Sequence, residues 1–489
     1  MKVKVLLVNP PDDLEAVLGS GANLVMPLEP LGLLYLAAVL RDSGEADVSV
    51  IDAPVEHLSL DELERRIVLH RPDVLGMTVF TSNGGLVLEL GRRVRARLPD
   101  TLVVLGNVHA AVFAREFLES GACDAVVHGD GEWVLRDIAR LVAAGSRDLS
   151  GLPAVSSMVD GVFVPHREVA RVDDLNQLPF PARDLVRQEL YDIPAVSNLP
   201  YDGGDGRGVG KHLFTSRGCP NRCTFCTVHH SQKQQFLDVS RTVDEMELLV
   251  RDYGANYLFF MDSLFVSRRQ RVLDICAEIR RRDLHFRWGC EAHVRFVDAE
   301  LVRAMAAAGC HDLAFGIESG VQRLLDGVKK HTTPELARAA VEMVKKNSKI
   351  KVSGLFILGL PGETLADSLA TIRFACSLPL DMAQFSMLVP YPGSEIFYDL
   401  RAKEEIDTGV RPDGTLDPTV WRRYSPYIGY TDNEPIWVTP DLTAAQLRWL
   451  QKKALRSFYF RPRPFLQQVR RLKLADLRRL VRTAYHTFF

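Results

Sequence analysis

The sequence lacks any apolar run long enough to cross a membrane and any excess of charge of one sign. In its 489 residues no stretch approaches the roughly 18 uncharged apolar residues that a spanning helix needs. The 60 Lys and Arg residues against 62 Asp and Glu leave a net charge of -2, which offers no general attraction to nucleic acid. The first apolar run stops at Pro10 and Pro11, too short for the core of a signal peptide. We therefore expect a cytoplasmic protein that acts on a small molecule, without a transmembrane segment or a nucleic-acid partner.

Cysteine is also scarce, with eight residues scattered too widely for a disulfide framework. Five of them lie inside apolar helix or strand patterns, where the simplest interpretation is a small buried hydrophobic residue: Cys123, Cys276, Cys290, Cys310 and Cys376. The remaining three share one short loop. Glycine-rich phosphate-binding motifs are missing too. The first predicted strand is followed by Asn9-Pro10-Pro11 instead of a G-x-G-x-x-G motif, and no P-loop occurs in the sequence. A dinucleotide ligand is therefore not expected.

Residues 1–145 alternate short β-rich runs with amphipathic helical runs. This alternation predicts right-handed crossovers and a doubly wound, Rossmann-like parallel α/β domain. A ligand of such a domain lies outside the carboxyl ends of the strands, in the loops that follow them. Residues 146–210 lose the rhythm, carry many prolines and end in a glycine-rich run, so we expect an interdomain linker there.

Residues 211–395 resume the alternation with six predicted strands and intervening helices, which predicts a partial (β/α)6 barrel. Residues 396–489 are expected to be mostly helical. From residue 451 to the end this region carries eleven Lys and Arg residues against Asp476 alone, interleaved with apolar side chains. The pattern favours a helical cap packed on the barrel with a basic outer face, and leaves open contact with a partner, a substrate or a membrane surface.

The sharpest signal is the loop that holds Cys219, Cys223 and Cys226, directly after the first strand of the barrel. Three cysteines at this spacing can reach one inorganic cube of four irons if the chain forms a tight loop, which Gly218 and Pro220 favour. The fourth iron then stays open for a ligand.

The alternative is a zinc site with His229 or His230 as the fourth ligand. Zinc knuckles usually pair cysteines within small domains, whereas this loop follows a barrel strand.

The Cys-x3-Cys-x2-Cys loop resembles the motif of the radical S-adenosylmethionine (radical SAM) superfamily, and the resemblance extends over residues 211–395. In that family SAM chelates the open iron of a [4Fe-4S] cluster and is cleaved to methionine and a 5′-deoxyadenosyl radical. The resemblance places Phe225 near the adenine. Asp262 and Ser263 stand where many members carry a Gly-Gly-Glu stretch that holds the SAM amino group, and they resemble the variant of the cobalamin-binding subgroup.

Two further positions match this family and also have simpler interpretations. Glu318 matches a carboxylate near the SAM ribose and amino group, but an acid there also suits a helix N-terminus. Gly359 permits a close approach of the backbone to an adenosyl ligand, or forms a tight turn.

The domain at residues 1–145 resembles the cobalamin-binding modules of this subgroup. The resemblance implies cobalamin contacts for residues after three strands: Thr78, Thr81, Gly106, Asn107, His109, Gly129 and Glu132. Thr78 could instead be an ordinary strand-end hydroxyl, and His109 a hydrogen-bonding group. The Asp-x-His-x-x-Gly motif of cobalamin mutases is absent, so we expect cobalamin with its own base displaced and no protein histidine under the cobalt.

The combined resemblance implies an enzyme that transfers a methyl group to an unactivated carbon or phosphorus of a small-molecule intermediate. In such enzymes one SAM methylates cob(I)alamin and a second supplies the adenosyl radical, while a flavodoxin-type or ferredoxin-type protein donates electrons. A cyclase or rearrangement enzyme without methyl transfer, like the anaerobic cyclase of chlorophyll synthesis, stays open, as does a cobalamin or redox sensor. No general acid or base can be nominated from the sequence.

Overall fold

The computed structural model describes residues 2–19, 27–191, 209–228 and 233–462. The chain forms two compact units. The first comprises Met1–Val17, Pro27–Tyr191 and Tyr391–Tyr424, and the second holds the remainder. Within the described residues no helix is both long and apolar enough to cross a membrane.

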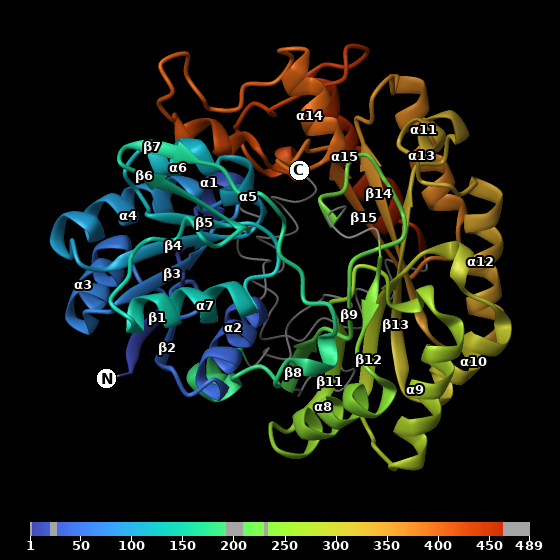
Figure 1. Ribbon diagram of the computed structural model, residues 1–489. Helices are drawn as coiled ribbons and strands as arrows, with labels where there is room; N and C mark the ends of the chain where they lie inside the picture. The colour runs from blue at the N-terminus through green and yellow to red at the C-terminus, as the bar shows by residue number, and fades with distance from the viewer. Residues whose placement is uncertain (1, 20–26, 192–208, 229–232, 463–489) are drawn as a thin grey trace. The chain divides into compact units, whose positions relative to one another are not determined.

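The first unit is built on a seven-stranded sheet in the order β2-β1-β3-β4-β5-β6-β7. Strands β1 to β5 are parallel, as the β–α alternation predicts. Their bounds are Val3–Asn9, Ala46–Asp52, Val74–Thr78, Leu102–Gly106 and Ala125–Val127. The helices are α1 (Leu14–Leu18), α2 (Leu31–Asp42), α3 (Leu60–His70), α4 (Gly84–Arg97), α5 (Val108–Val112), α6 (Ala114–Glu119) and α7 (Glu132–Ala143). Figure 1 shows α2 beside α7 and α3 beside α4, flanking this sheet.

The expected linker at 146–210 is partly wrong, because two antiparallel strands, β6 (Val155–Val159) and β7 (Val162–Val164), extend the first sheet. They form a hairpin around Asp160 and Gly161, whose φ angles are 50° and 77°. An Asp-Gly pair between β-rich runs is a strong hairpin signal, since both central residues need positive φ. The β–α rhythm stops here because an antiparallel pair needs no crossover helix.

The expected single C-terminal region, residues 396–489, is also divided. Its first part contains α14 (Glu395–Ala402) and a 3-10 helix at Pro418–Arg423, and it belongs to the first unit. Trp421 is buried there with its ring 4.3 Å from that of His109, and Arg422 forms an ion pair with Asp13 at 2.7 Å. A sequence pattern cannot reveal this return, because it depends on contacts between distant segments.

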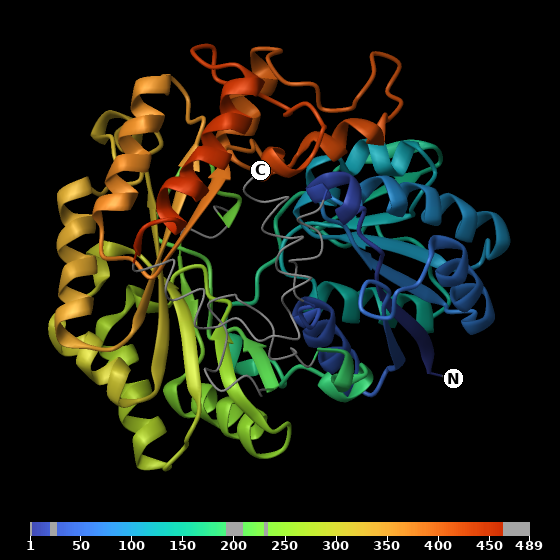
Figure 2. The same cartoon turned by 180° about the vertical axis from the view of Figure 1, so that it is seen from behind.

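The second unit contains a six-stranded, all-parallel sheet in the order β15-β14-β13-β12-β11-β8. The strands are β8 (Val209–Leu213), β11 (Ala255–Phe260), β12 (Arg287–Ala292), β13 (Cys310–Glu318), β14 (Lys351–Leu358) and β15 (Met382–Met387). Helices α8 (Val239–Arg251), α9 (Arg269–Arg281), α10 (Ala299–Ala307), α11 (Gln322–Gly327), α12 (Pro334–Asn347) and α13 (Leu365–Ser377) connect them. The arrangement is the predicted partial (β/α)6 barrel, with its helices on the outside (Figures 1 and 2).

The helical cap predicted for the tail is present as α15 (Ala444–Tyr459). Its buried side chains, among them Leu447, Leu450 and Phe458, join the core of the second unit, and the helix packs against α13 and β15. Figure 2 shows it from behind. Residues 463–489, which complete the basic tail, lie outside the described residues.

Candidate active site

The cysteine loop leaves the carboxyl end of β8, at the edge where a barrel of this kind carries its site. Its base is closed by a short antiparallel pair, β9 (Ser216–Arg217) with β10 (Gln235–Phe236). Gly218 has a φ of 83°, which lets the chain turn directly before Cys219. The loop is tied further along where the Thr224 backbone N–H donates to the Val328 carbonyl at 3.1 Å.

The three thiols are close enough to influence one another electrostatically. Burial raises the pKa of Cys223 to about 11 and also raises that of Cys226, and the neighbouring thiols add to both effects. Among the described His, Cys, Asp and Glu side chains, no group of three is arranged to hold a single metal ion. A four-iron cube accepts one thiolate at each of three separate irons, so its ligands need not meet at one point. The donor set of this loop suits such a cube, whereas His229 and His230 lie outside the described residues.

Asp262 anchors the segment that leads into the cysteine loop. Its carboxylate is buried and accepts hydrogen bonds from the backbone N–H groups of Thr215 and Ser216, at 2.6 and 3.1 Å, and from both hydroxyls, at 2.5 and 2.9 Å. The guanidinium of Arg271 donates to the Thr215 carbonyl at 3.0 Å, so the same segment is held from both sides. Ser263, by contrast, is exposed.

Glu318, at the end of β13, forms a buried ion pair with Lys330 at 2.6 Å. Its φ of 66° is unusual for a residue other than glycine, and such strain often accompanies function. The alternative that Glu318 caps a helix is wrong, because α11 begins at Gln322 with Val321 as its N-cap. Lys330 also lies 6.0 Å from the ring centre of Phe225, which places all three residues beside the cysteine loop.

Gly359 has a φ of 82° in the turn after β14, and a side chain there would come within 3.2 Å of Leu447 on α15. The tight-turn interpretation therefore accounts for this glycine, and its role toward SAM stays a prediction.

In the first unit, the residues predicted after β3 and β4 lie together. The Asn107 amide donates to the Thr78 hydroxyl at 3.2 Å, and Thr81 hydrogen-bonds with His109 at 3.2 Å. Asn107 has φ 82° and ψ 167°, a region that is nearly confined to glycine. A strained, hydrogen-bonded residue next to Gly106 at the carboxyl end of the sheet is the kind of feature that marks a ligand-binding loop.

His109, unlike a residue exposed at a ligand-binding surface, is buried. It is 2% exposed, packs against Phe113, Phe117 and Trp421, and its Nε2 has no hydrogen-bond partner among the described residues. Burial lowers the pKa of His109 to about 3, so the imidazole is neutral. This surrounding favours a packing and hydrogen-bonding role, and a contact with cobalamin stays a prediction.

Gly129 and Glu132 follow β5, in a different environment. Gly129 has a φ of 92° and bridges to Ala170, whose carbonyl oxygen would lie 2.2 Å from an added Cβ. Glu132 is buried in the first turn of α7, where a carboxylate suits the helix dipole. Both positions therefore have structural explanations, and their contact with cobalamin is untested.

One group at the carboxyl ends of β1 and β2 was missed by sequence reasoning. The Asp52 carboxylate accepts from the Tyr191 hydroxyl at 2.5 Å and from the Asn9 amide at 2.8 Å, and burial raises its pKa to about 6. The position of Asp52 at a strand end could have drawn attention, but its partner Tyr191 is 139 residues away.

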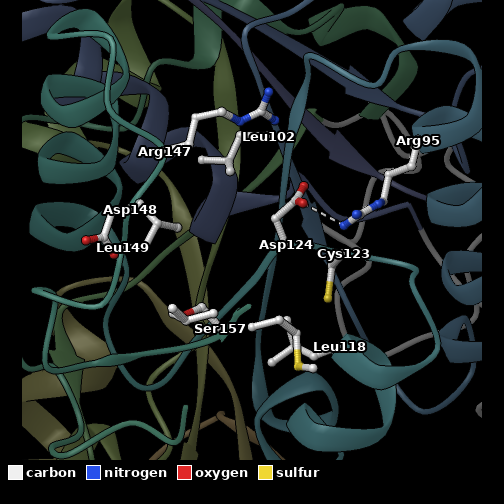
Figure 3. A pocket seen from close by; sticks show the side chains of 11 residues that line it. Arg95, Leu102, Leu118, Cys123, Asp124, Arg147, Asp148, Leu149 and Ser157 are labelled. Atoms are coloured by element: carbon white, nitrogen blue, oxygen red, sulfur yellow. Dashed lines mark hydrogen bonds and ion pairs between the residues drawn. The ribbon is translucent and has the colours of Figure 1, made fainter. Parts of the chain in front are cut away.

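A separate cavity of about 350 Å³ lies at the amino ends of β4 and β5, among Arg95, Cys123, Asp124 and Ser157 (Figure 3). Arg95 and Asp124 form an ion pair at 2.6 Å across it. This edge is opposite the predicted ligand edge, and none of the predicted site residues lines the cavity.

Comparison with known proteins matches a known family to each of the two units. The B12 binding domain family matches residues 18–139, and the radical SAM superfamily matches residues 213–375. An uncharacterised methyltransferase of Pyrococcus horikoshii is 30% identical over 478 residues, covering 96% of this chain and 95% of that protein. The anaerobic magnesium-protoporphyrin IX monomethyl ester cyclase of Rubrivivax gelatinosus is 29% identical, covering 79% of this chain and 69% of the relative.

Among solved structures, the radical SAM methyltransferase TsrM from Kitasatospora setae, with cobalamin and a [4Fe-4S] cluster bound, superposes with a TM-score of 0.70. The match covers 97% of this chain and 92% of TsrM at 20% identity, so it shows a shared fold. Two domains, one for cobalamin and one for SAM cleavage, thus define a cobalamin-dependent radical SAM enzyme. The chain belongs to this family, and its cofactors are a [4Fe-4S] cluster, SAM and cobalamin.

Proposed function

We propose that this enzyme transfers a methyl group from SAM to an unactivated carbon or phosphorus of a small-molecule biosynthetic intermediate. The observation that carries the proposal is the end-to-end match, 96% of this chain, with a relative named as a methyltransferase. When bound, the cluster supplies the electron that cleaves SAM and cobalamin supplies the methyl carrier. The protein's own residues bind and orient these groups and exclude water from the radical.

Cys219, Cys223 and Cys226 hold the cluster, and the Asp262 anchor fixes the segment that precedes them. Phe225 would contact the adenine of SAM, and Glu318 and the exposed Ser263 would hold its amino group, as the family resemblance implies. In the first unit, Thr78 and Asn107 receive the nucleotide tail of cobalamin in its base-displaced form. Their hydrogen bond and the strained backbone of Asn107 support this assignment.

The enzyme works in the cytoplasm with a flavodoxin-type or ferredoxin-type electron donor. None of the eight cysteines is joined in a disulfide, as expected in a reducing compartment. A thiolate-ligated cluster that cleaves SAM has to receive an electron for each cleavage, and a donor protein of this kind would supply it.

The test uses SAM with a deuterated methyl group and the anaerobically reconstituted holoenzyme, reduced and incubated with a small-molecule extract of the source organism. Methyl transfer predicts label in a product and S-adenosylhomocysteine whose formation requires cobalamin. The second candidate is a cyclisation or rearrangement, which the similarity to the magnesium-protoporphyrin cyclase favours. That reaction would give 5′-deoxyadenosine without S-adenosylhomocysteine and without label in any product.

A further inference from the structure

Lys330 and Glu318 form a buried charge pair next to the cysteine loop. The Nζ and Oε1 atoms are 2.6 Å apart, and the two side chains are 10% and 9% exposed. The pair is packed around Gly316, where an added Cβ would lie 2.6 Å from the carboxylate and 2.8 Å from the ammonium group. Both charges are therefore held in fixed positions with little water to screen them.

Lys330 is the member of the pair that contacts the cysteine loop. Its Nζ lies 6.0 Å from the ring centre of Phe225, which stands between Cys223 and Cys226 in the sequence. The Val328 carbonyl, two residues before Lys330, accepts the Thr224 backbone N–H at 3.1 Å. A buried positive charge is therefore held beside the loop, and Glu318 opposes part of its field because the carboxylate lies 2.6 Å from the ammonium group.

We propose that the Lys330–Glu318 pair sets the reduction potential of the cluster held by Cys219, Cys223 and Cys226, with Lys330 making reduction easier and Glu318 limiting that effect. Reduction adds one negative charge to the cluster, and a fixed positive field stabilises the more negative state. This inference rests on the cluster assignment, but not on methyl transfer or on the identity of the substrate.

The magnitude follows from Coulomb's law. For any unit charge at a separation on the order of 10 Å, in a medium of effective dielectric constant about 20, removal changes an equilibrium by roughly tenfold. A tenfold change in a one-electron equilibrium corresponds to about 59 mV. Glu318→Gln leaves Lys330 uncompensated and is expected to raise the cluster potential by about this amount. Lys330→Met removes the nearer charge and is expected to lower it, whether or not Glu318 then takes up a proton.

The experiment is an EPR-monitored redox titration of the reconstituted holoenzyme and its variants, without substrate. The expected order of potentials is Glu318→Gln above wild type, wild type above the double variant, and Lys330→Met at or below the double variant. Lys330→Arg, which keeps the charge, should stay near wild type. Lys345→Met is the matched control, because Lys345 pairs with Asp381 at 2.7 Å at the amino end of β14, away from the cysteine loop.

A second measurement separates this inference from the cluster assignment. In cluster-free protein, the pH dependence of Cys223 alkylation should shift to lower pH in Glu318→Gln and to higher pH in Lys330→Met. If no cluster assembled but the alkylation profiles shifted in these directions, the cluster assignment would fail and the electrostatic coupling would stand. Unchanged potentials in a fully loaded Glu318→Gln variant, or shifts of the same sign in both single variants, would overturn the proposal.

Discussion

The buried carboxylate of Asp262 holds the segment that leads into the cysteine loop through four hydrogen bonds. Replacing Asp262 by Ala removes four hydrogen bonds to Thr215 and Ser216. It also removes a carboxylate that interacts favourably with the charge of the buried Arg271. Hydrogen bonds to a charged group contribute about 1.5–3 kcal/mol each, and leaving a buried charge without its partner costs about 3–5 kcal/mol. These costs overlap, so we expect a loss of about 3–5 kcal/mol in local stability.

The loss should appear in the segment that Asp262 holds. Hydrogen exchange followed by mass spectrometry should show faster exchange across residues 213–237, which include β9, β10 and the cysteine loop. We also expect the iron content after reconstitution to fall. Asp262→Asn keeps the shape and some acceptors, so its effect should be about 1–3 kcal/mol.

Ser263→Ala is the control, because this exposed side chain should change stability by no more than about 0.5 kcal/mol. The result that would refute the anchor role is an Asp262→Ala variant with unchanged exchange and full iron content that has lost SAM binding. That outcome would instead make Asp262 a direct SAM ligand.

Three other predictions concern the first unit. The cob(II)alamin EPR signal of the holoenzyme should lack hyperfine splitting from a histidine nitrogen, since His109 is buried and packed against aromatic rings, among them that of Trp421. Splitting that vanished in His109→Ala would contradict this. Burial raises the pKa of Asp52 to about 6, so the stability that this group contributes is full below about pH 4 and is lost as the pH rises through 6. Relative to Asp52→Asn, the wild type should lose about 2–3 kcal/mol of unfolding free energy between pH 4 and 7. A difference between the two proteins that does not change with pH would refute this. Gly84→Ala should destabilise the unit by about 1–3 kcal/mol, because the added Cβ would come 2.8 Å from the Trp421 ring. Gly44→Ala is the control: its Cβ would meet nothing within 4 Å, so only the backbone strain of its φ of 72° should destabilise the unit.

Much of the architecture could be predicted because it depends on local patterns. The alternating β-rich and helical runs predict all five parallel strands of the first sheet and all six of the second. The cysteine spacing predicts the cluster loop. The hairpin at Asp160 and Gly161 carried a usable turn signal that the proline-rich composition around it obscured.

The parts that could not be predicted depend on long-range contacts. Nothing near Glu318 in the sequence shows that Lys330 neutralises it, and nothing near His109 shows that Trp421 covers it. The family resemblance predicts a SAM contact for Asp262, but its four hydrogen bonds to Thr215 and Ser216 appear only when β8 and β11 lie side by side. Cofactor contacts in the first unit stay predictions for the same reason, since they depend on a ligand as well as on the chain.

The proposed enzyme depends on the loop of Cys219, Cys223 and Cys226, which would hold the cluster that cleaves SAM. The most direct measurement is 5′-deoxyadenosine formation by the anaerobically reconstituted, reduced enzyme, with each of these cysteines replaced in turn by Ala. Cys276→Ala and Cys376→Ala are matched controls, because both thiols lie within helices, α9 and α13. We expect no 5′-deoxyadenosine from the three loop variants. The two controls should form wild-type amounts and keep their iron content. Continued formation by a loop variant, or iron lost in proportion in a control, would contradict this assignment.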